Sequence, residues 1–204
     1  MSPIAMHPEA DHAGWQEEIG KLDIALYAAV AATPTPGLDR YFRRLSRAAD
    51  HSKLWIGSAA ALAAAGGRPG QRAAVNGLAS VAFSSAVVNL LLKPLSRRRR
   101  PDRRANEVAS LRRVAMPRST SFPSGHAASA FAFATGVGIA LPGAGLPLTA
   151  TAALVAYSRV HTGVHYPSDT VAGSVIGAGL APAVVAALDH RRAMRTERET
   201  GPPF

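Results

Sequence analysis

The feature of this sequence that most constrains its fold is the separation of charged from uncharged residues. Four long stretches contain no Asp, Glu, Lys or Arg: 54–67, 73–92, 119–158 and 170–188. They are rich in Ala and Leu, lack the alternation of apolar and polar residues that marks strands, and run too long for strands. We therefore expect helices over about 52–66, 73–94, 125–141, 146–159 and 168–188.

Two of these helices are long enough to cross a lipid bilayer, which takes about 20 apolar residues. The stretches 73–94 and 168–188 meet that length directly, and the other three approach it with flanking uncharged residues. Many of their residues are Ala, Gly or Ser, which favour close helix packing within lipid. The sequence predicts an all-α integral membrane bundle of about five to six core helices, with a site at helix ends on one membrane face.

The overall composition indicates an ordered protein with a polyanionic partner. Hydrophobic residues make up 48% and charged residues 18% of the 204 residues, which excludes a disordered chain. The formal net charge of +10 suggests a phosphate, an acidic lipid or a nucleic acid as partner. With no cysteine, the chain has no disulfide, no thiolate nucleophile and no zinc site of the cysteine type.

The chain divides into three regions by composition. Residues 1–51 hold two amphipathic segments, 15–32 and 38–47, which we expect on the membrane surface or against the bundle. Residues 52–188 form the membrane-embedded core, and 189–204 form a charged tail that we expect to fray. The first 20 residues contain four acidic side chains and no apolar core, so no cleavable signal peptide is predicted.

Most of the positive charge lies in one loop. The segment 93–118 contains ten Lys and Arg residues and two acidic residues. We expect Arg97, Arg98 and Arg99 to be solvated or to contact anionic lipid headgroups. We expect Arg100 instead to belong to the site, because its spacing from Lys93 and the proline that follows it form a motif. A nucleic-acid surface is not expected, since the loop has no aromatic residue for base stacking.

Three short motifs carry the candidate chemistry. They are Lys93 with Arg100-Pro101, then Pro123-Ser124-Gly125-His126, then Ser158-Arg159 followed by His165 and Asp169. Each motif stands where a predicted helix ends or begins, and in an antiparallel bundle all of those ends lie on one face. The sequence therefore predicts that the three motifs meet in one site.

The residue types in these motifs suit phosphoryl transfer. Lys and Arg donate charge-assisted hydrogen bonds to a tetrahedral anion, and a helix that begins at Ser124-Gly125 offers free N–H groups to it. A histidine paired with a carboxylate is a candidate nucleophile, here His165 with Asp169. His126 is then the general acid and base for the leaving oxygen and for water. The motifs hold no cluster of metal ligands, which indicates transfer through a phosphohistidine without metal or cofactor.

Together the three motifs resemble the signature of the type-2 phosphatidic acid phosphatase superfamily. That superfamily includes lipid phosphate phosphatases, polyprenyl diphosphate phosphatases, soluble acid phosphatases and vanadium haloperoxidases. The resemblance covers 93–169 in motifs and 52–188 in helix layout. Membrane members usually have six core helices, so either 15–32 supplies the sixth or the core is shorter here.

The resemblance also implies a role for each motif residue. The residues that hold the phosphate would be Lys93, Arg100, Ser124, Gly125 and Arg159. The catalytic residues would be His165 as nucleophile, Asp169 as its orienting partner and His126 as general acid and base.

The activity expected from these residues is a membrane phosphatase acting on a lipid phosphate or a polyprenyl (di)phosphate. A polyprenyl-phosphoryl pentose phosphate is a further candidate substrate. Three alternatives stay open: a soluble acid phosphatase of the same superfamily, a vanadium haloperoxidase, and a non-enzymatic basic membrane protein that binds anionic lipid. In each membrane case the expected partners are lipids and not nucleic acid.

The distribution of Lys and Arg predicts an orientation in the cell membrane. With five spans, 17 Lys and Arg lie on the face of the motifs and 6 on the other face. Because basic residues are retained on the cytoplasmic side, the site is expected to face the cytoplasm.

Several residues near the motifs receive structural interpretations. His161 lacks the companions that a metal site needs, so we expect a structural role or a substrate contact. Ser158 is expected to cap or pack. Trp15, Tyr41 and Trp55 are expected to be anchors at the membrane interface.

Overall fold

The computed structural model describes residues 8–201, which form helices and loops with no strand among them. Residues 1–7 and 202–204 of the two terminal regions lie outside this range. The elements are α1 (Pro8–Ala32), α2 (Pro36–Ala48), η1 (Asp50–Ser52), α3 (Lys53–Ala65), α4 (Gly67–Ala86), η2 (Val87–Leu92), α5 (Lys93–Leu95), η3 (Ser110–Arg112), α6 (Gly125–Ala140), α7 (Pro142–His161) and α8 (Pro167–Thr200).

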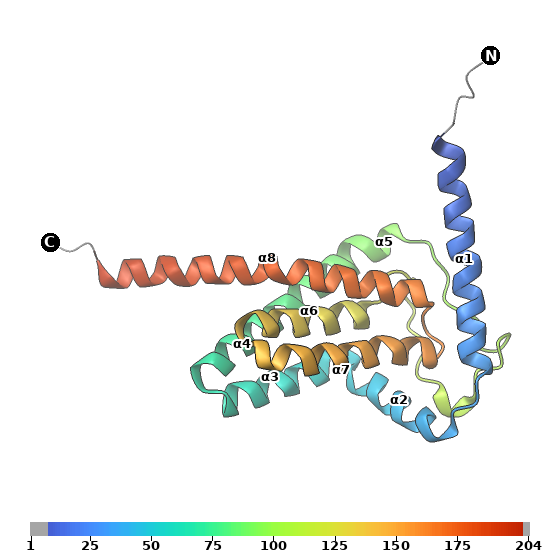
Figure 1. Ribbon diagram of the computed structural model, residues 1–204, viewed down its shortest axis with the longest axis horizontal. Helices are drawn as coiled ribbons and strands as arrows, with labels where there is room; N and C mark the ends of the chain where they lie inside the picture. Colours follow the sequence, from blue (N-terminus) through green and yellow to red (C-terminus); the bar gives the residue numbers. More distant parts are fainter. Residues whose placement is uncertain (1–7, 202–204) are drawn as a thin grey trace, which may run out of the picture.

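The five helices predicted for the core are present and pack as one bundle (Figure 1). α6 packs against α4, α7 and α8, and α3 packs against α4, which continues through η2 into α5. Trp55 and Phe133 meet in the core with ring centroids 5.2 Å apart, next to Val137 and Val155. All four side chains are buried, so the apolar faces of α3, α6 and α7 form one core.

Glycine sets the closest approach between α6 and α8. A Cβ atom on Gly177 would lie 2.1 Å from the carbonyl oxygen of Ala128, whereas nothing lies within 4 Å of one on Gly179. We expect Gly177→Ala to lower the free energy of unfolding by about 1–3 kcal/mol, because the helices must move apart. Gly179→Ala should leave it within about 1 kcal/mol of wild type. Thermal unfolding in detergent compares the two, and equal melting temperatures would contradict this packing.

The C-terminal region is helical where the sequence predicts a frayed tail. α8 continues to Thr200. Asp189 accepts hydrogen bonds from Arg72 at 2.8 Å and from Arg192 at 2.6 Å, and Arg192 also reaches the Asn76 side chain at 3.1 Å. These contacts tie α8 to α4 beyond the apolar stretch, and the sequence pattern alone does not reveal such pairs.

Two helices also begin earlier than predicted, because prolines near their starts do not stop them. α4 begins at Gly67 with Pro69 in its first turn, and α7 begins at Pro142 and continues through Pro147. For Pro69 and Pro142, in the first turn, the missing N–H would have no helical partner in any case. Pro147 lies inside α7, which continues past it with one backbone hydrogen bond fewer.

One predicted interface anchor is wrong. Trp55 is only 1% exposed and lies in the core, whereas Trp15 and Tyr41 are 60% and 49% exposed. The reason is that Trp55 lies on the face of α3 that packs on the bundle, and charge-free surroundings do not distinguish that face from one turned to lipid.

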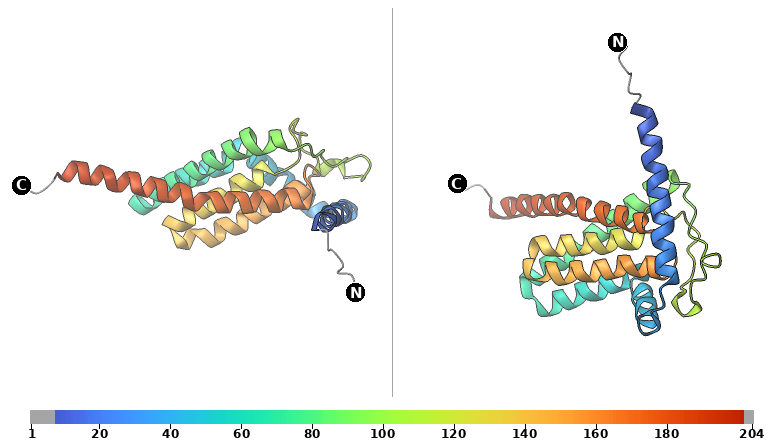
Figure 2. Two further views of the ribbon diagram at one scale, coloured as in Figure 1. Left: turned by 90° about the horizontal axis from the view of Figure 1, so that it is seen from above. Right: turned by 45° about the vertical axis from the view of Figure 1, so that its right-hand side comes forward.

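The fold is that of an all-α membrane bundle. Among the described residues, Gly67–Leu95 and Pro167–Glu199 are long and apolar enough to cross a membrane. Large apolar side chains stand on the bundle surface, with Leu146 80% and Val175 66% exposed, as suits contact with lipid. α1 runs across one end of the bundle and contacts α7 and α8 (Figures 1 and 2), as expected for a helix lying against the bundle.

Candidate active site

The three motifs meet at the end of the bundle that α1 crosses (Figure 2). Each predicted residue lies at a helix end or in an adjoining loop: Lys93 in α5, Arg100 in the loop after it, Ser124, Gly125 and His126 at the start of α6, Arg159 in the last turn of α7, His165 before α8 and Asp169 in its first turn. The antiparallel packing of the bundle brings these ends together, as the sequence predicts.

A hydrogen-bonded carboxylate orients His165. Nδ1 of His165 lies 3.4 Å from Oδ2 of Asp169, and both side chains are buried. The same Oδ2 accepts hydrogen bonds from the Tyr166 backbone N–H at 2.8 Å and from the Ser121 hydroxyl. Oδ1 accepts one from Arg98 at 2.8 Å. The carboxylate is therefore held in one position from several sides.

The second ring nitrogen of His165 faces a cation. Nε2 lies 3.3 Å from Nη1 of Arg100, which also donates to the Val164 carbonyl at 2.8 Å. A guanidinium can only donate, so Nε2 bears the lone pair and Nδ1 carries the proton toward Asp169. Burial and the charges of Arg100 and Arg159 lower the pKa of His165 from 6.5 to about 3. At neutral pH the imidazole is thus uncharged and nucleophilic at Nε2.

Arg159 offers an unused donor inside the site. Its side chain is buried, and its Nη1 donates to the Ser46 hydroxyl and lies 3.8 Å from Oδ1 of Asp50. Its Nε has no hydrogen-bond partner among residues 8–201. Because a buried unpaired N–H is costly, this group suits an anion oxygen.

Lys93 and Arg100 lie near the other cations. The Lys93 ammonium is 3.4 Å from the Ser119 hydroxyl, and Arg100 Nη2 is 3.3 Å from the same oxygen. Burial lowers the pKa of Arg100, although it remains charged at neutral pH. A Cβ atom on Gly125 would be 3.5 Å from the Lys93 nitrogen, so the ammonium lies against the start of α6. An anion here would meet both the cations and the N-terminus of a helix.

Ser124 serves mainly to hold the start of α6. Its hydroxyl accepts from the Ala127 N–H at 3.5 Å, and its own N–H donates to the Asp169 carbonyl at 2.9 Å. The N–H and one lone pair of the hydroxyl are thus used within the protein, and the hydroxyl proton remains available to an anion. The N–H groups left for an anion at this helix start are those of Gly125 and His126.

Asp50 is a functional candidate that sequence reasoning missed. Its Oδ1 lies 2.8 Å from Nε2 of His126. The bond to His126 and the charges of Arg159 and His51 lower the pKa of Asp50, so it is a carboxylate at neutral pH. The only signal was its position in a short polar link before the first core helix. His51 and Ser52 follow with φ of 55° and 59°, a left-handed turn that is uncommon outside glycine.

Arg98 is the second missed residue, and the expectation that it is solvated is wrong. It donates to Asp169 and to Asp23 of α1, and its guanidinium lies 4.5 Å from the centre of the Tyr166 ring. Asp23 is only 3% exposed. Since α1 crosses the end of the bundle, it supplies the acid that pairs with this arginine.

Two polar residues near the motifs form contacts within the protein. Ser158 donates its hydroxyl to the Val155 carbonyl at 2.6 Å. His161 is buried, lies 3.1 Å from Oδ1 of Asp39 and packs against Phe42, which gives it a structural role. Among the described residues, no group of three or more His, Asp or Glu side chains is placed to hold a metal ion.

Comparison with known proteins assigns the family. The model of the PAP2 superfamily matches residues 73–193 of this chain. The chain belongs to the PAP2 superfamily.

Relatives in bacteria support this PAP2 assignment. Decaprenylphosphoryl-5-phosphoribose phosphatase of Mycobacterium tuberculosis (strain CDC 1551 / Oshkosh) is 36% identical over 159 residues, which cover 76% of this chain and 85% of the relative. The protein of that name from Mycolicibacterium smegmatis is 37% identical over 153 residues, covering 74% and 78%. Lipid A 4'-phosphatase of Bacteroides thetaiotaomicron is 30% identical over 129 residues, covering 61% and 57%.

Solved structures share the PAP2 fold. Aquifex aeolicus LpxE superposes with a TM-score of 0.67 at 23% identity, covering 81% of this chain and 95% of LpxE. The phosphatidylglycerolphosphate phosphatase of Bacillus subtilis, described as a transmembrane PAP2 type, gives 0.62 at 23% identity, covering 85% and 87%.

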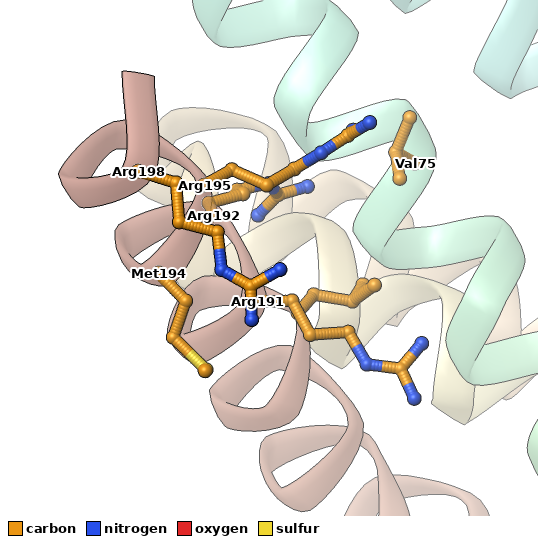
Figure 3. A pocket seen from close by; sticks show the side chains of 7 residues that line it. Val75, Arg191, Arg192, Met194, Arg195 and Arg198 are labelled. Carbon is orange, nitrogen blue, oxygen red and sulfur yellow. The ribbon is translucent and has the colours of Figure 1, made fainter. Parts of the chain in front are cut away.

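A separate hollow in this PAP2 chain lies at the far end of the bundle. It measures about 520 Å³ between α4 and α8 and contains none of the eight predicted site residues. Arginines of α8 line it together with Val75, Leu188 and Met194: Arg191, Arg192, Arg195 and Arg198 (Figure 3). These arginines follow directly after the apolar part of α8, at the opposite end from His165.

Proposed function

We propose that this chain is a metal-independent phosphatase that hydrolyses a lipid phosphate or polyprenyl phosphate through a phosphohistidine, with 52–188 as its catalytic core. The observation that carries the proposal is the buried His165, whose Nε2 lone pair points to Arg100 while Asp169 fixes the ring. Arg159, with an unpaired Nε, and Lys93 complete a set of cations for one phosphate.

Two displacements at phosphorus account for hydrolysis. The phosphate replaces the contact between Arg100 and Nε2, and Nε2 of His165 attacks phosphorus while the bond to the leaving oxygen breaks. His126 gives that oxygen a proton from Nδ1, because its Nε2–H is bonded to Asp50. Water then attacks the phosphohistidine, His126 takes the water proton, and the N–P bond breaks to release phosphate. The cations stabilise the charge on the transferring oxygens in both steps.

The relatives favour a sugar phosphate joined to a lipid as substrate. The mycobacterial relatives are named for decaprenylphosphoryl-5-phosphoribose, and the Bacteroides relative for lipid A. We extend the polyprenyl-phosphoryl pentose phosphate class to this chain, because the match covers 85% of the Mycobacterium tuberculosis relative.

Phosphate release from a panel of lipid phosphates in detergent tests the function. We expect hydrolysis to continue in excess chelator, because the site uses Lys and Arg in place of a metal. Vanadate should inhibit, because it mimics the five-coordinate transition state. Loss of activity in chelator that magnesium restores would contradict the mechanism. Release from none of the lipids would favour a lipid-binding protein without enzymatic activity.

We also propose that the chain is a multi-pass protein with its active site on the cytoplasmic face. The support is the excess of Lys and Arg on that face. Because the chain has no cysteine, Ser110→Cys and Met194→Cys each introduce a single thiol at an exposed position on opposite ends of the bundle. In intact cells, an impermeant thiol reagent should label the cysteine at 194 and spare the one at 110. The reverse pattern would invert the orientation.

A further inference from the structure

A small polar pocket opens beside His126, away from the His165 dyad. It measures about 190 Å³, and Lys93, Gly125 and His126 form its border with the phosphate-binding cations. The rest of its polar lining comes from outside the three motifs: His51, Ser52, Ser85, Asn89 and Ser129. The hydrolysis steps above give these five residues no role.

The lining offers neutral hydrogen-bonding groups. Asn89 donates its Nδ2 to the Ser85 carbonyl at 2.8 Å, which leaves its Oδ1 as an acceptor. That Oδ1 lies 3.9 Å from the Cβ position of Gly125, so it faces the start of α6. The hydroxyls of Ser85 and Ser129 are 3.0 Å apart, so one donates to the other and the second keeps a free proton. The pocket therefore presents both acceptors and a donor to a hydroxylated ligand.

The pocket lies where a lipid headgroup can reach it. Ser85 and Asn89 belong to the stretch Gly67–Leu95, which is apolar and long enough to cross a membrane. Asn89 is exposed, and its neighbours Leu90 and Leu91 are 72% and 59% exposed. The chain here is wound as the π-helix η2, a local form often found at functional sites. Polar side chains on an otherwise lipid-facing segment indicate a binding role.

The position of His126 assigns an occupant to this pocket. His126 protonates the leaving oxygen, so the leaving group begins at His126 and continues into the hollow that His126 lines. Lys93 of this lining is already assigned to the scissile phosphate. Asn89 and the serine pair can exchange hydrogen bonds with the hydroxyl groups of a leaving group. We propose that this pocket binds the hydroxylated part of the leaving group, namely the sugar or polyol that bears the scissile phosphate.

This inference rests on the proposed function and assigns recognition of the sugar or polyol in its substrate to Asn89, Ser85 and Ser129. The test compares an alkyl pentoside 5-phosphate with an alkyl phosphate of equal chain length in one detergent. We expect kcat/KM to be about tenfold higher for the pentoside phosphate, as one or two added hydrogen bonds provide. Asn89→Leu should bring this ratio close to one.

A matched control is available in Asn106. It is also a surface asparagine that donates its Nδ2 to the carbonyl four residues earlier, here Asp102 at 2.9 Å, but it lies outside the pocket. Asn106→Leu should keep the tenfold ratio. If Asn89→Leu fails to fold, Ser129→Ala replaces it, with the same expected fall in ratio.

The outcomes separate the two proposals. A wild-type ratio near one, or a ratio unchanged by Asn89→Leu and Ser129→Ala, would overturn the assignment of the pocket while leaving the phosphatase in place. Absence of phosphate release from both substrates would overturn the proposed function, and this inference with it. Vanadate should inhibit Asn89→Leu and wild type equally. Equal inhibition would show that the fall in the kcat/KM ratio comes from the leaving-group pocket and not from a damaged phosphate site.

Discussion

Replacing His165 with alanine is expected to lower kcat on the order of 10⁴-fold or more, because the substitution removes the nucleophile of the first displacement. The geometry makes this residue the nucleophile: its Nε2 lone pair faces the cations, and Asp169 holds the opposite nitrogen at 3.4 Å. A pKa near 3 means that Nε2 stays unprotonated as pH falls, well below the pH at which an ordinary histidine becomes charged. The acid limb of the pH–rate profile should therefore not lie near 6.5.

The same substitution has a direct chemical readout. Wild-type enzyme quenched during turnover of a ³²P-labelled substrate should carry phosphate that is labile to acid and stable to base, as expected for phosphohistidine. His165→Ala should carry none, and His190→Ala, altered on α8 far from the site, should carry wild-type amounts. Undiminished activity in His165→Ala, or labelled phosphate elsewhere in the protein, would contradict the mechanism.

The sequence predicts the convergence of the site well, because convergence follows from helix order. Lys93 ends one charge-free stretch and Arg159 ends another, so antiparallel packing alone places both beside the start of α6. The spacing of His165 and Asp169 favours their pairing, since His165 lies two residues before α8 and Asp169 lies in its first turn.

The partners of these residues could not be predicted in the same way. Asp50 reaches His126, and Asp23 reaches Arg98, from segments far away in the chain. Both acids lie outside the charge-free stretches, where many charged residues alternate with apolar ones and none stands out. Their roles depend on where α1 and η1 pack, and neither helical periodicity nor motif spacing contains that information.

The prediction that Trp55 is an anchor at the membrane interface was wrong for a related reason. Charge-free helices are apolar on every side, so the pattern does not tell the face turned to lipid from the face turned to the core. The packing of Trp55 against Phe133 of α6 shows that this face of α3 is turned to the core. For the same reason the sequence did not predict the polar pocket. In the sequence, Asn89 and Ser85 are single polar residues within an apolar stretch, and nothing indicates that they lie in one pocket.

Replacing His126 with alanine is expected to lower kcat by about 10²–10⁴-fold for alkyl and sugar monophosphates, because their leaving oxygens need a proton as the bond to phosphorus breaks. 4-Nitrophenolate leaves as a stable anion, so the first displacement on 4-nitrophenyl phosphate, measured as 4-nitrophenolate released in a single turnover, should slow much less. The comparison therefore separates lost acid catalysis from a damaged phosphate site, which would slow both substrates alike.

Asp50 makes the prediction for His126 sharper. Its carboxylate lies 2.8 Å from Nε2 of His126, which orients the ring and balances the charge of the imidazolium that donates the proton. We expect Asp50→Asn to lower kcat for a sugar phosphate by about 10–100-fold, since a hydrogen bond between charged groups contributes about 1.5–3 kcal/mol. In a single turnover of 4-nitrophenyl phosphate the loss should again be small. In a double variant with His126→Ala, removing the carboxylate should add little, because Asp50 acts through the histidine. Additive losses would instead indicate that Asp50 acts on Arg159, which lies 3.8 Å from the same oxygen.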